Sequence, residues 1–126
     1  MPEDIKVAET HEYARILGDN RVRIGITDFA ATQLGDIVFV DVPEIGDTIE
    51  KGESFGSIES VKAQSDLYAP VSGEVIALNS MLEDSPELIN DDSYDAGWII
   101  EVEITNAAEL DTLQTGENYL DLVESQ

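Results

Sequence analysis

The sequence predicts a mainly β domain, arranged as a sandwich or barrel of small sheets. Apolar and polar residues alternate from Val22 to Ile26, which is typical of a strand with one buried face. The segment DIVFVDVP, residues 36–43, is rich in β-branched residues. Between residues 46 and 79, brief apolar runs are separated by turns that contain glycine. At 126 residues, the chain has the length of one compact domain, so we expect a single domain over residues 1–126.

The first half of the chain predicts a hairpin, a short helix and a strand, in that order. Residues 13–26 form two apolar runs around the turn Gly18-Asp19-Asn20. Thr27 is placed to cap a short helix that Gly35 would end. The following strand is expected to stop at Pro43, because proline cannot donate to a strand ladder.

The second half predicts further short strands and a helical end. Ser85 and Pro86 favour a helical turn over residues 87–89. Residues 97–104 alternate again, and we expect one solvent-facing side that carries Ile99, Glu101 and Glu103. Asn106 with Glu109 matches a capping box. Thr115 is expected to start a last helix that packs on the sheets through a set of apolar residues: Tyr119, Leu120, Leu122 and Val123.

The chain is strongly and unevenly acidic. It has 28 acidic and 6 basic residues, and its formal net charge is -22. Residues 64–126 contain no lysine or arginine. Nucleic acid is therefore a poor candidate partner, because phosphate binding needs clustered basic side chains. A protein partner should instead present a basic surface.

The side chains offer little chemistry of their own. Cysteine is absent, and His11 is the only histidine, so thiol nucleophiles, most catalytic triads and multi-histidine metal sites are excluded. We expect no catalytic residue and no bound metal. No run of 18 apolar residues predicts a membrane span, and MPEDIKVAE lacks the features of a signal peptide. A cytoplasmic protein without membrane contact is the simplest expectation.

Lys62 is the most unusual residue, since it is one of three lysines and the last basic residue of the chain. Residues 56–68 predict a hairpin with Lys62 near its tip. A lysine there is accessible to a modifying enzyme, because its long side chain carries the amine away from the backbone. It also fits an ordinary solvated lysine paired with Glu59 or Asp66, which would stabilise the fold by only about 0–1 kcal/mol. Position alone leaves both interpretations open.

The segment ESVKAQSDLYAPVSGEV, residues 59–75, resembles the lipoyl-attachment segment of glycine cleavage system H proteins, which belong to the biotinyl/lipoyl-attachment family. The likeness continues through HEYA, residues 11–14, through residues 24–30 and 34–47, and through ELIN and GWII, residues 87–90 and 97–100. This resemblance implies a flattened barrel-sandwich hybrid of two small antiparallel sheets, with short flanking helices and a helical C-terminus. It also implies lipoate joined by an amide to Lys62.

The resemblance implies a carrier rather than an enzyme. Such a carrier takes the aminomethyl group of glycine from a pyridoxal-phosphate glycine decarboxylase to a tetrahydrofolate-dependent aminomethyltransferase. A dihydrolipoyl dehydrogenase then reoxidises the cofactor, and a lipoate-attaching enzyme is a further partner. The attached lipoate would explain how a chain without cysteine can take part in thiol chemistry. We expect the carrier to be a monomer.

Other functions use the same residues. A carrier domain of a 2-oxoacid dehydrogenase or of a biotin-dependent carboxylase usually has its lysine within DKA or MKM, and this chain has ESVKA. A relay that supplies lipoyl or octanoyl groups to dehydrogenase complexes would use Lys62 as well; lipoylation of the dehydrogenases in a strain lacking this protein would test it. An acidic interaction domain with an unmodified Lys62 is the remaining alternative.

Two carboxylates are candidates for holding the loaded arm. Asp66 follows Lys62 by four residues on the returning strand, and Glu12 lies in the HEYA segment, which a family-like fold would place nearby. Ionised carboxylates only accept hydrogen bonds, so they suit the ammonium of an aminomethyl group. Solvated surface charges are the alternative interpretation for both residues.

Overall fold

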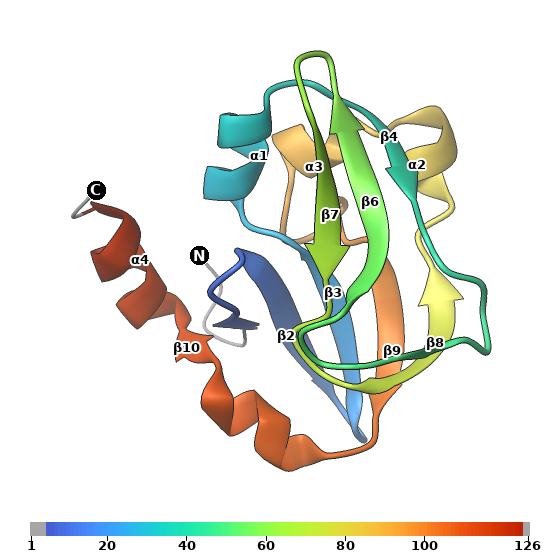
Figure 1. Cartoon of the computed structure of the whole chain (residues 1–126), viewed down its shortest axis with the longest axis vertical. Helices are drawn as coiled ribbons and strands as arrows, with labels where there is room; N and C mark the ends of the chain where they lie inside the picture. The colour runs from blue at the N-terminus through green and yellow to red at the C-terminus, as the bar shows by residue number, and fades with distance from the viewer. Residues whose placement is uncertain (1–4, 125–126) are drawn as a thin grey trace.

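A computed structural model of the chain describes residues 5–124, without the side chains of Glu117, Asp121, Leu122 and Glu124. Two antiparallel sheets pack face to face (Figure 1). The larger has seven strands in the order β10 (Gln114–Thr115), β1 (Ile5–Val7), β2 (Glu12–Gly18), β3 (Arg21–Ile26), β9 (Ile100–Ile104), β8 (Gly73–Leu78) and β5 (Thr48–Ile49). The smaller has three strands in the order β4 (Ile37–Asp41), β6 (Ser54–Ser60) and β7 (Gln64–Tyr68).

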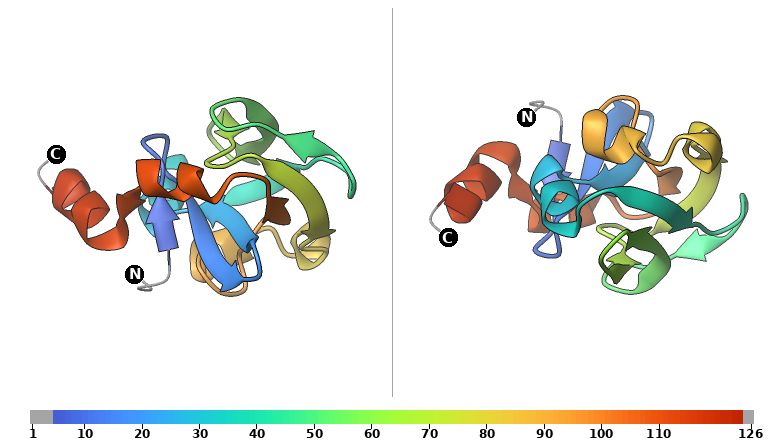
Figure 2. Two further views of the ribbon diagram at one scale, coloured as in Figure 1. Left: turned by 90° about the horizontal axis from the view of Figure 1, so that it is seen from below. Right: turned by 90° about the horizontal axis from the view of Figure 1, so that it is seen from above.

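Short helices flank the sheets. They are α1 (Asp28–Leu34), α2 (Met81–Asp84), α3 (Leu88–Asp91), the 3-10 helix η1 (Ala107–Thr112) and α4 (Gly116–Glu124). In the two further views, α4 projects from one side of the molecule (Figure 2). The predicted class is confirmed, because the fold is mainly β, with two antiparallel sheets, short helices and a helical C-terminus. No helix within residues 5–124 is long and apolar enough to cross a membrane.

The main core lies between the two sheets. Ile58 and Leu67 of the smaller sheet are buried in the same cluster as Ile24, Val75 and Val102 of the larger one. Burial of such side chains contributes about 1.5–3 kcal/mol each relative to exposure. This core fixes the smaller sheet, and with it the hairpin that carries Lys62, against the larger sheet.

The predicted turns and caps around α1 are confirmed. Thr27 Oγ1 accepts a hydrogen bond from Ala30 N at 3.1 Å, as an N-cap should. Gly35 ends the helix with a φ of 86°, a conformation that favours glycine. Asp19 and Asn20 also have positive φ values, which these two residue types tolerate in tight hairpin turns.

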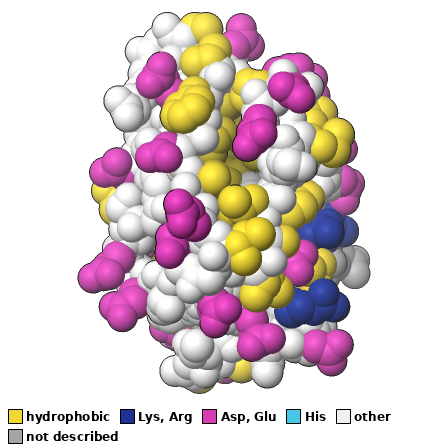
Figure 3. Space-filling model, turned by 90° about the vertical axis from the view of Figure 1, so that its right-hand side faces the viewer, with side chains coloured by type: hydrophobic (Ala, Val, Ile, Leu, Met, Phe, Trp, Pro, Cys, Tyr) yellow, Lys and Arg dark blue, Asp and Glu magenta, His cyan; other side chains and the backbone are white. Residues whose placement is uncertain are grey.

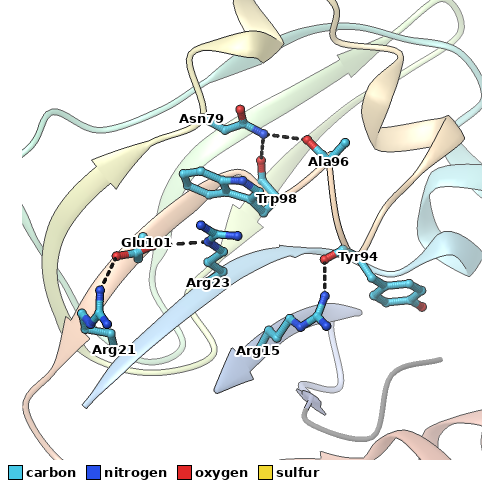
Figure 4. A network of polar contacts seen from close by, with 8 residues as sticks. All are labelled: Arg15, Arg21, Arg23, Asn79, Tyr94, Ala96, Trp98 and Glu101. Atoms are coloured by element: carbon cyan, nitrogen blue, oxygen red, sulfur yellow. Dashed lines mark hydrogen bonds and ion pairs between the residues drawn. The ribbon is translucent and has the colours of Figure 1, made fainter. Parts of the chain in front are cut away.

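The prediction of a solvent-facing side on residues 97–104 is wrong for Ile99 and Glu101, which are only 1% and 9% exposed. Glu101 lies opposite Arg23 across the β3–β9 pair and accepts a hydrogen bond from Arg23 Nε at 3.3 Å (Figure 4). Arg21 adds an ion pair at 3.7 Å. The arginines on the neighbouring strand cover the Glu101 carboxylate and compensate its charge. The alternation of residues along β9 does not predict this burial, because it carries no information about the neighbouring strand.

The C-terminal region follows the prediction in part. Asn106 caps η1 by accepting from Ala108 N, but Glu109 accepts from the amide and hydroxyl of Ser72 in place of closing a capping box. Thr115 Oγ1 accepts from Asn118 N and so caps α4. Tyr119 packs with Ile5, Val7 and Tyr13 at the edge of the larger sheet. The expectation is wrong for Leu120, which is 37% exposed, and the expected contact of Leu122 lies outside the described side chains.

Candidate functional site

Lys62 lies at the tip of the β6–β7 hairpin, as predicted, and Ser60 fixes the turn that presents it. Ser60 N donates to Ala63 O at 2.8 Å and closes the turn. Ser60 Oγ accepts from Lys62 N at 3.3 Å and from Ala63 N at 3.1 Å. Both amides that flank the lysine side chain are therefore held by one hydroxyl.

A second set of contacts ties this tip to the segment between α1 and β4 (Figure 1). Val61 N donates to Asp36 O at 3.0 Å. A Cβ added to Gly35 would lie 3.2 Å from Lys62 Cε, so the lysine side chain runs across this glycine. Asn90 of α3 holds the same segment by donating to Gly35 O and accepting from Ile37 N, each at 2.9 Å. The hairpin tip is thus braced from two sides.

The amine of Lys62 is available for modification. Lys62 is exposed. Within the described part of the chain, its Nζ makes no ion pair with Glu59 or Asp66. Lys51 differs, because its Nζ donates to Thr112 Oγ1 at 2.5 Å. The structure places Lys62 as a free amine on a fixed turn.

A groove of about 470 Å³ runs between β2, α1 and the β6–β7 hairpin. Its walls are largely apolar, with Phe29, Leu34, Ile58 and Leu67 among the lining residues. Leu34 precedes Gly35, against which the Lys62 side chain rests, so the groove lies near the lysine. The remaining lining residues are Thr10, His11, Glu12, Ile26, Ala30, Gln33, Ser65, Asp66 and Tyr68.

The structure brings both predicted carboxylates to this groove, in different environments. Glu12 is 2% exposed and accepts hydrogen bonds from Tyr68 N at 3.1 Å and from Thr10 Oγ1. No described lysine or arginine forms an ion pair with Glu12, and burial raises the pKa of its carboxyl to about 7. Asp66 is exposed, opposite Ser57 on the neighbouring strand. A buried carboxyl beside a cleft, with no cation of its own, is a candidate functional group.

His11 links the groove wall to the C-terminal helix. Its ring stacks on Phe29 with centroids 5.4 Å apart, and its Nδ1 lies 2.7 Å from Tyr119 Oη. Tyr119 Oη lies 2.8 Å from Thr27 Oγ1. Burial lowers the pKa of His11, so the neutral imidazole is favoured. Among the side chains that the structure describes, no group of three or more His, Asp or Glu residues is arranged to hold a metal ion.

The buried Glu12 gives the protein a testable pH dependence. Its folded pKa of about 7 lies above the ordinary value of 4.5, so between these values the folded state keeps a proton that the unfolded state has released. The free energy of unfolding should therefore fall as the pH rises through this range, by up to about 3 kcal/mol from this group. Glu12→Gln should lack this contribution.

The measurement is urea unfolding of both proteins at several pH values from 4.5 to 8. The difference in unfolding free energy, unmutated protein minus variant, should decrease steadily from pH 4.5 to about 7 and then level off. Comparison with the variant removes the contribution of the other acidic groups. A difference that does not change with pH would show that Glu12 titrates normally in the folded state.

Ser60, Asn90 and Gly35 shape the site, and sequence reasoning assigned none of them a role at the lysine. Ser60 was visible only as part of the ESVKA motif, and Gly35 only as a helix end. Asn90 lies 28 residues beyond Lys62, and its contacts depend on the packing of α3 against α1. No local sequence pattern identifies such a contact.

The model of the glycine cleavage H-protein family matches residues 5–126. The chain belongs to this family. A glycine cleavage system H protein from Vibrio parahaemolyticus is 49% identical, with all of both chains covered. One from a Synechococcus species is 57% identical over 98% of this chain and 95% of that protein.

The fold agrees with this membership. The crystal structure of a glycine cleavage system H protein from Mycobacterium marinum superposes with a TM-score of 0.90, at 40% identity, over 98% of this chain and 99% of that one. H proteins are the lipoyl carriers of the glycine cleavage system and are not enzymes. The family carries lipoate covalently on a lysine. The predicted family, carrier function and cofactor are confirmed.

Proposed function

We propose that Lys62 is the lysine that carries lipoate in this protein, and that the groove beside it receives the loaded arm. The observation that supports this most strongly is the placement of Lys62, an exposed amine on a braced hairpin tip near the groove. A fixed tip presents the amine to a lipoate-attaching enzyme in one orientation. The adjoining groove then gives the modified side chain a place to rest.

The residues of the groove fit the chemistry of a lipoyl arm. The hydrocarbon and dithiolane parts of lipoate are apolar, as are the walls formed by Phe29, Leu34 and Ile58. When bound, lipoate supplies the sulfur chemistry that the side chains of this cysteine-free chain cannot provide. The protein contributes the attachment point, the orientation of the arm and partial exclusion of water.

Glu12 and Asp66 are proposed to hold the cationic end of the loaded arm. Both line the groove, and Glu12 is already oriented by Tyr68 N and Thr10 Oγ1. An ammonium group beside Glu12 would stabilise the ionised carboxylate, because it would supply the positive charge that this buried group otherwise lacks. A hydrogen bond to a charged group contributes about 1.5–3 kcal/mol net, which slows loss of the cargo and still allows an enzyme to withdraw the arm.

The proposed partners are the three enzymes of the system and the enzyme that attaches lipoate. They are a pyridoxal-phosphate glycine decarboxylase, a tetrahydrofolate-dependent aminomethyltransferase and a dihydrolipoyl dehydrogenase. A tethered arm reaches each docked enzyme at an effective concentration of order millimolar. The proposed carrier is a single domain over residues 1–126, a cytoplasmic monomer.

Reconstitution tests this function. The lipoylated chain is titrated into the three purified enzymes of a bacterial glycine cleavage system, and carbon dioxide released from carboxyl-labelled glycine is measured. We expect saturable stimulation of carbon dioxide release by the lipoylated chain and not by the same chain produced without lipoate. Equal rates with the two preparations would refute the carrier function of the arm.

A further inference from the structure

The C-terminal helix reaches the groove between β2, α1 and the β6–β7 hairpin through the buried side chain of Tyr119. Helix α4 contacts β1 and β10 at the edge of the larger sheet (Figure 1). Tyr119 is 1% exposed, and its hydroxyl lies 2.7 Å from His11 Nδ1 and 2.8 Å from Thr27 Oγ1. His11 lines the groove, and Thr27 caps α1, which forms one of its walls. One hydroxyl of α4 therefore contacts two of the segments that shape the groove.

The hydrogen atoms along this chain of contacts can be assigned, because Thr27 is fully buried. Thr27 Oγ1 accepts from Ala30 N at 3.1 Å, and within the described residues Tyr119 Oη is its one other partner. The Thr27 hydroxyl therefore donates to Tyr119, since a buried donor without a partner is costly. The Tyr119 hydroxyl then donates to His11 Nδ1. A neutral imidazole that accepts at Nδ1 carries its hydrogen on Nε2.

The position of the His11 ring is fixed by three further features. The ring stacks on Phe29 with centroids 5.4 Å apart. Thr27 N donates to His11 O at 3.0 Å, which ties the backbone of His11 to the start of α1. The backbone of His11 has a φ of 76°, a left-handed conformation that few residue types adopt readily. Because the ring is held in place, its charge is the property that can still change.

The charges around His11 favour a proton on its ring. The chain has a net charge of -22, and acidic side chains outnumber basic ones on the side shown in Figure 3. Among the described residues that line the groove, none is a lysine or an arginine, and His11 alone can become a cation. Negative charges nearby stabilise an imidazolium. The described ionisable side chains on the elements packed around His11 are Glu12 on β2, Asp28 on α1, Asp66 and Tyr68 on β7, and Tyr119 on α4.

We propose that Tyr119 is a positioning residue for the arm: its hydroxyl keeps His11 neutral, so that the ammonium of the loaded arm is the cation that pairs with Glu12. The inference rests on the proposed carrier function. An imidazolium in the same groove would compensate the charge of Glu12 itself and would repel the ammonium.

The hydroxyl of Tyr119 opposes this protonation. A hydrogen on His11 Nδ1 would force the Tyr119 hydroxyl to turn toward Thr27, and the buried hydrogen of Thr27 would lose its partner. Burial acts in the same direction, because it lowers the pKa of His11. The C-terminal helix would thus make the groove selective for a cationic arm.

The state of His11 is measured by nitrogen NMR of the labelled, unlipoylated chain, in which His11 is the only histidine. We expect a neutral ring with its hydrogen on Nε2. Tyr119→Phe removes only the hydroxyl, and His11 should then titrate at a higher pH. A neutral ring with its hydrogen on Nδ1 in the unmutated protein would overturn the proposal, whether or not the variant folds. The same titration in both proteins would overturn it as well.

Tyr94→Phe is the matched control. Tyr94 packs against the same aromatic cluster as Tyr119, and its hydroxyl donates to Asp28 Oδ1 at 2.8 Å. The change removes one hydroxyl from this cluster without removing a partner of His11. Tyr94→Phe should leave the hydrogen on Nε2 and the titration of His11 nearly unchanged.

The effect on the arm is measured as release of ammonia and formaldehyde from loaded carriers between about pH 5 and 8, where histidine changes charge. The rate for each variant is divided by the rate for the unmutated protein at the same pH, which cancels the chemistry of the cargo. For Tyr119→Phe this ratio should be near one at high pH and rise about fivefold or more as the pH falls. A ratio that does not change with pH would indicate general loosening of the groove and would contradict the proposal.

The variant His11→Asn with Tyr119→Phe separates charge from packing. Asparagine tolerates a positive φ and takes up no proton in this pH range, so the ratio for the double variant should lose its dependence on pH. A dependence that persists without His11 would contradict the proposal. Failure of the carrier function appears separately, as a chain whose intact mass shows no lipoate on Lys62, and the NMR measurement does not depend on that modification.

Discussion

Lys62→Arg is expected to abolish lipoylation and to reduce glycine-dependent carbon dioxide release to the level measured without the carrier. Arginine keeps the positive charge, but its guanidinium does not form the lipoyl amide. The side chain of Lys62 is exposed and its turn is held by backbone and Ser60 contacts, so the free energy of unfolding should change by about 0.5 kcal/mol or less. Intact mass, the reconstituted assay and urea unfolding measure the three effects.

Lys51→Arg is the matched control, because it makes the same chemical change at a lysine outside the hairpin tip. The Lys51→Arg protein should be lipoylated and should support glycine-dependent carbon dioxide release. If Lys62→Arg supported glycine oxidation at the normal rate, Lys62 would not be the attachment site. If it failed to fold, the absence of lipoate would say nothing about the site, which is why unfolding is measured on the same samples.

The double variant Glu12→Gln with Asp66→Asn is expected to fold and accept lipoate but to lose the aminomethyl group faster in the absence of the aminomethyltransferase. Removal of a charged hydrogen bond worth about 1.5–3 kcal/mol corresponds to a rate increase of about ten- to a hundredfold. The measurement is release of ammonia and formaldehyde from the loaded carrier over time. Most of the effect should come from Glu12, because Glu12 is buried and Asp66 is exposed.

Glu74→Gln with Asp111→Asn removes the same number of charges at exposed positions that do not line the groove, and should not accelerate release. The single variants Glu12→Gln and Asp66→Asn show how much of the faster release is due to each carboxylate. If the loaded double variant released ammonia and formaldehyde no faster than the unmutated protein, neither Glu12 nor Asp66 would hold the loaded arm.

Local patterns predicted the parts of the fold that depend on neighbouring residues. The Thr27 cap, the Gly35 helix end and the hairpin tip at Lys62 are all set by turn and cap chemistry within a few residues. Family resemblance predicted that Glu12 lies near Asp66, but the groove that both residues line was not predicted. The structure adds that Glu12 is buried with a raised pKa, a property that depends on β7 and the Thr10 turn around it.

The features that sequence reasoning missed arise from contacts between distant segments. Glu101 is buried because Arg21 and Arg23 on another strand cover it. Asn90 braces the lysine tip from α3. The bulge at Val38 depends on the register between β4 and β6, so the consecutive apolar residues of β4 predicted a strand and gave no sign that two of them would be exposed. Periodicity along one segment does not define the partner of that segment.

The attachment site is tested most directly by intact mass and peptide mapping of the protein isolated from cells supplied with lipoate. We expect one lipoyl amide per chain, on the peptide that contains Lys62, and none on Lys6 or Lys51. Lipoate found mainly on Lys6 or Lys51, or a chain left unmodified while lipoate and its attaching enzyme are plentiful, would contradict it.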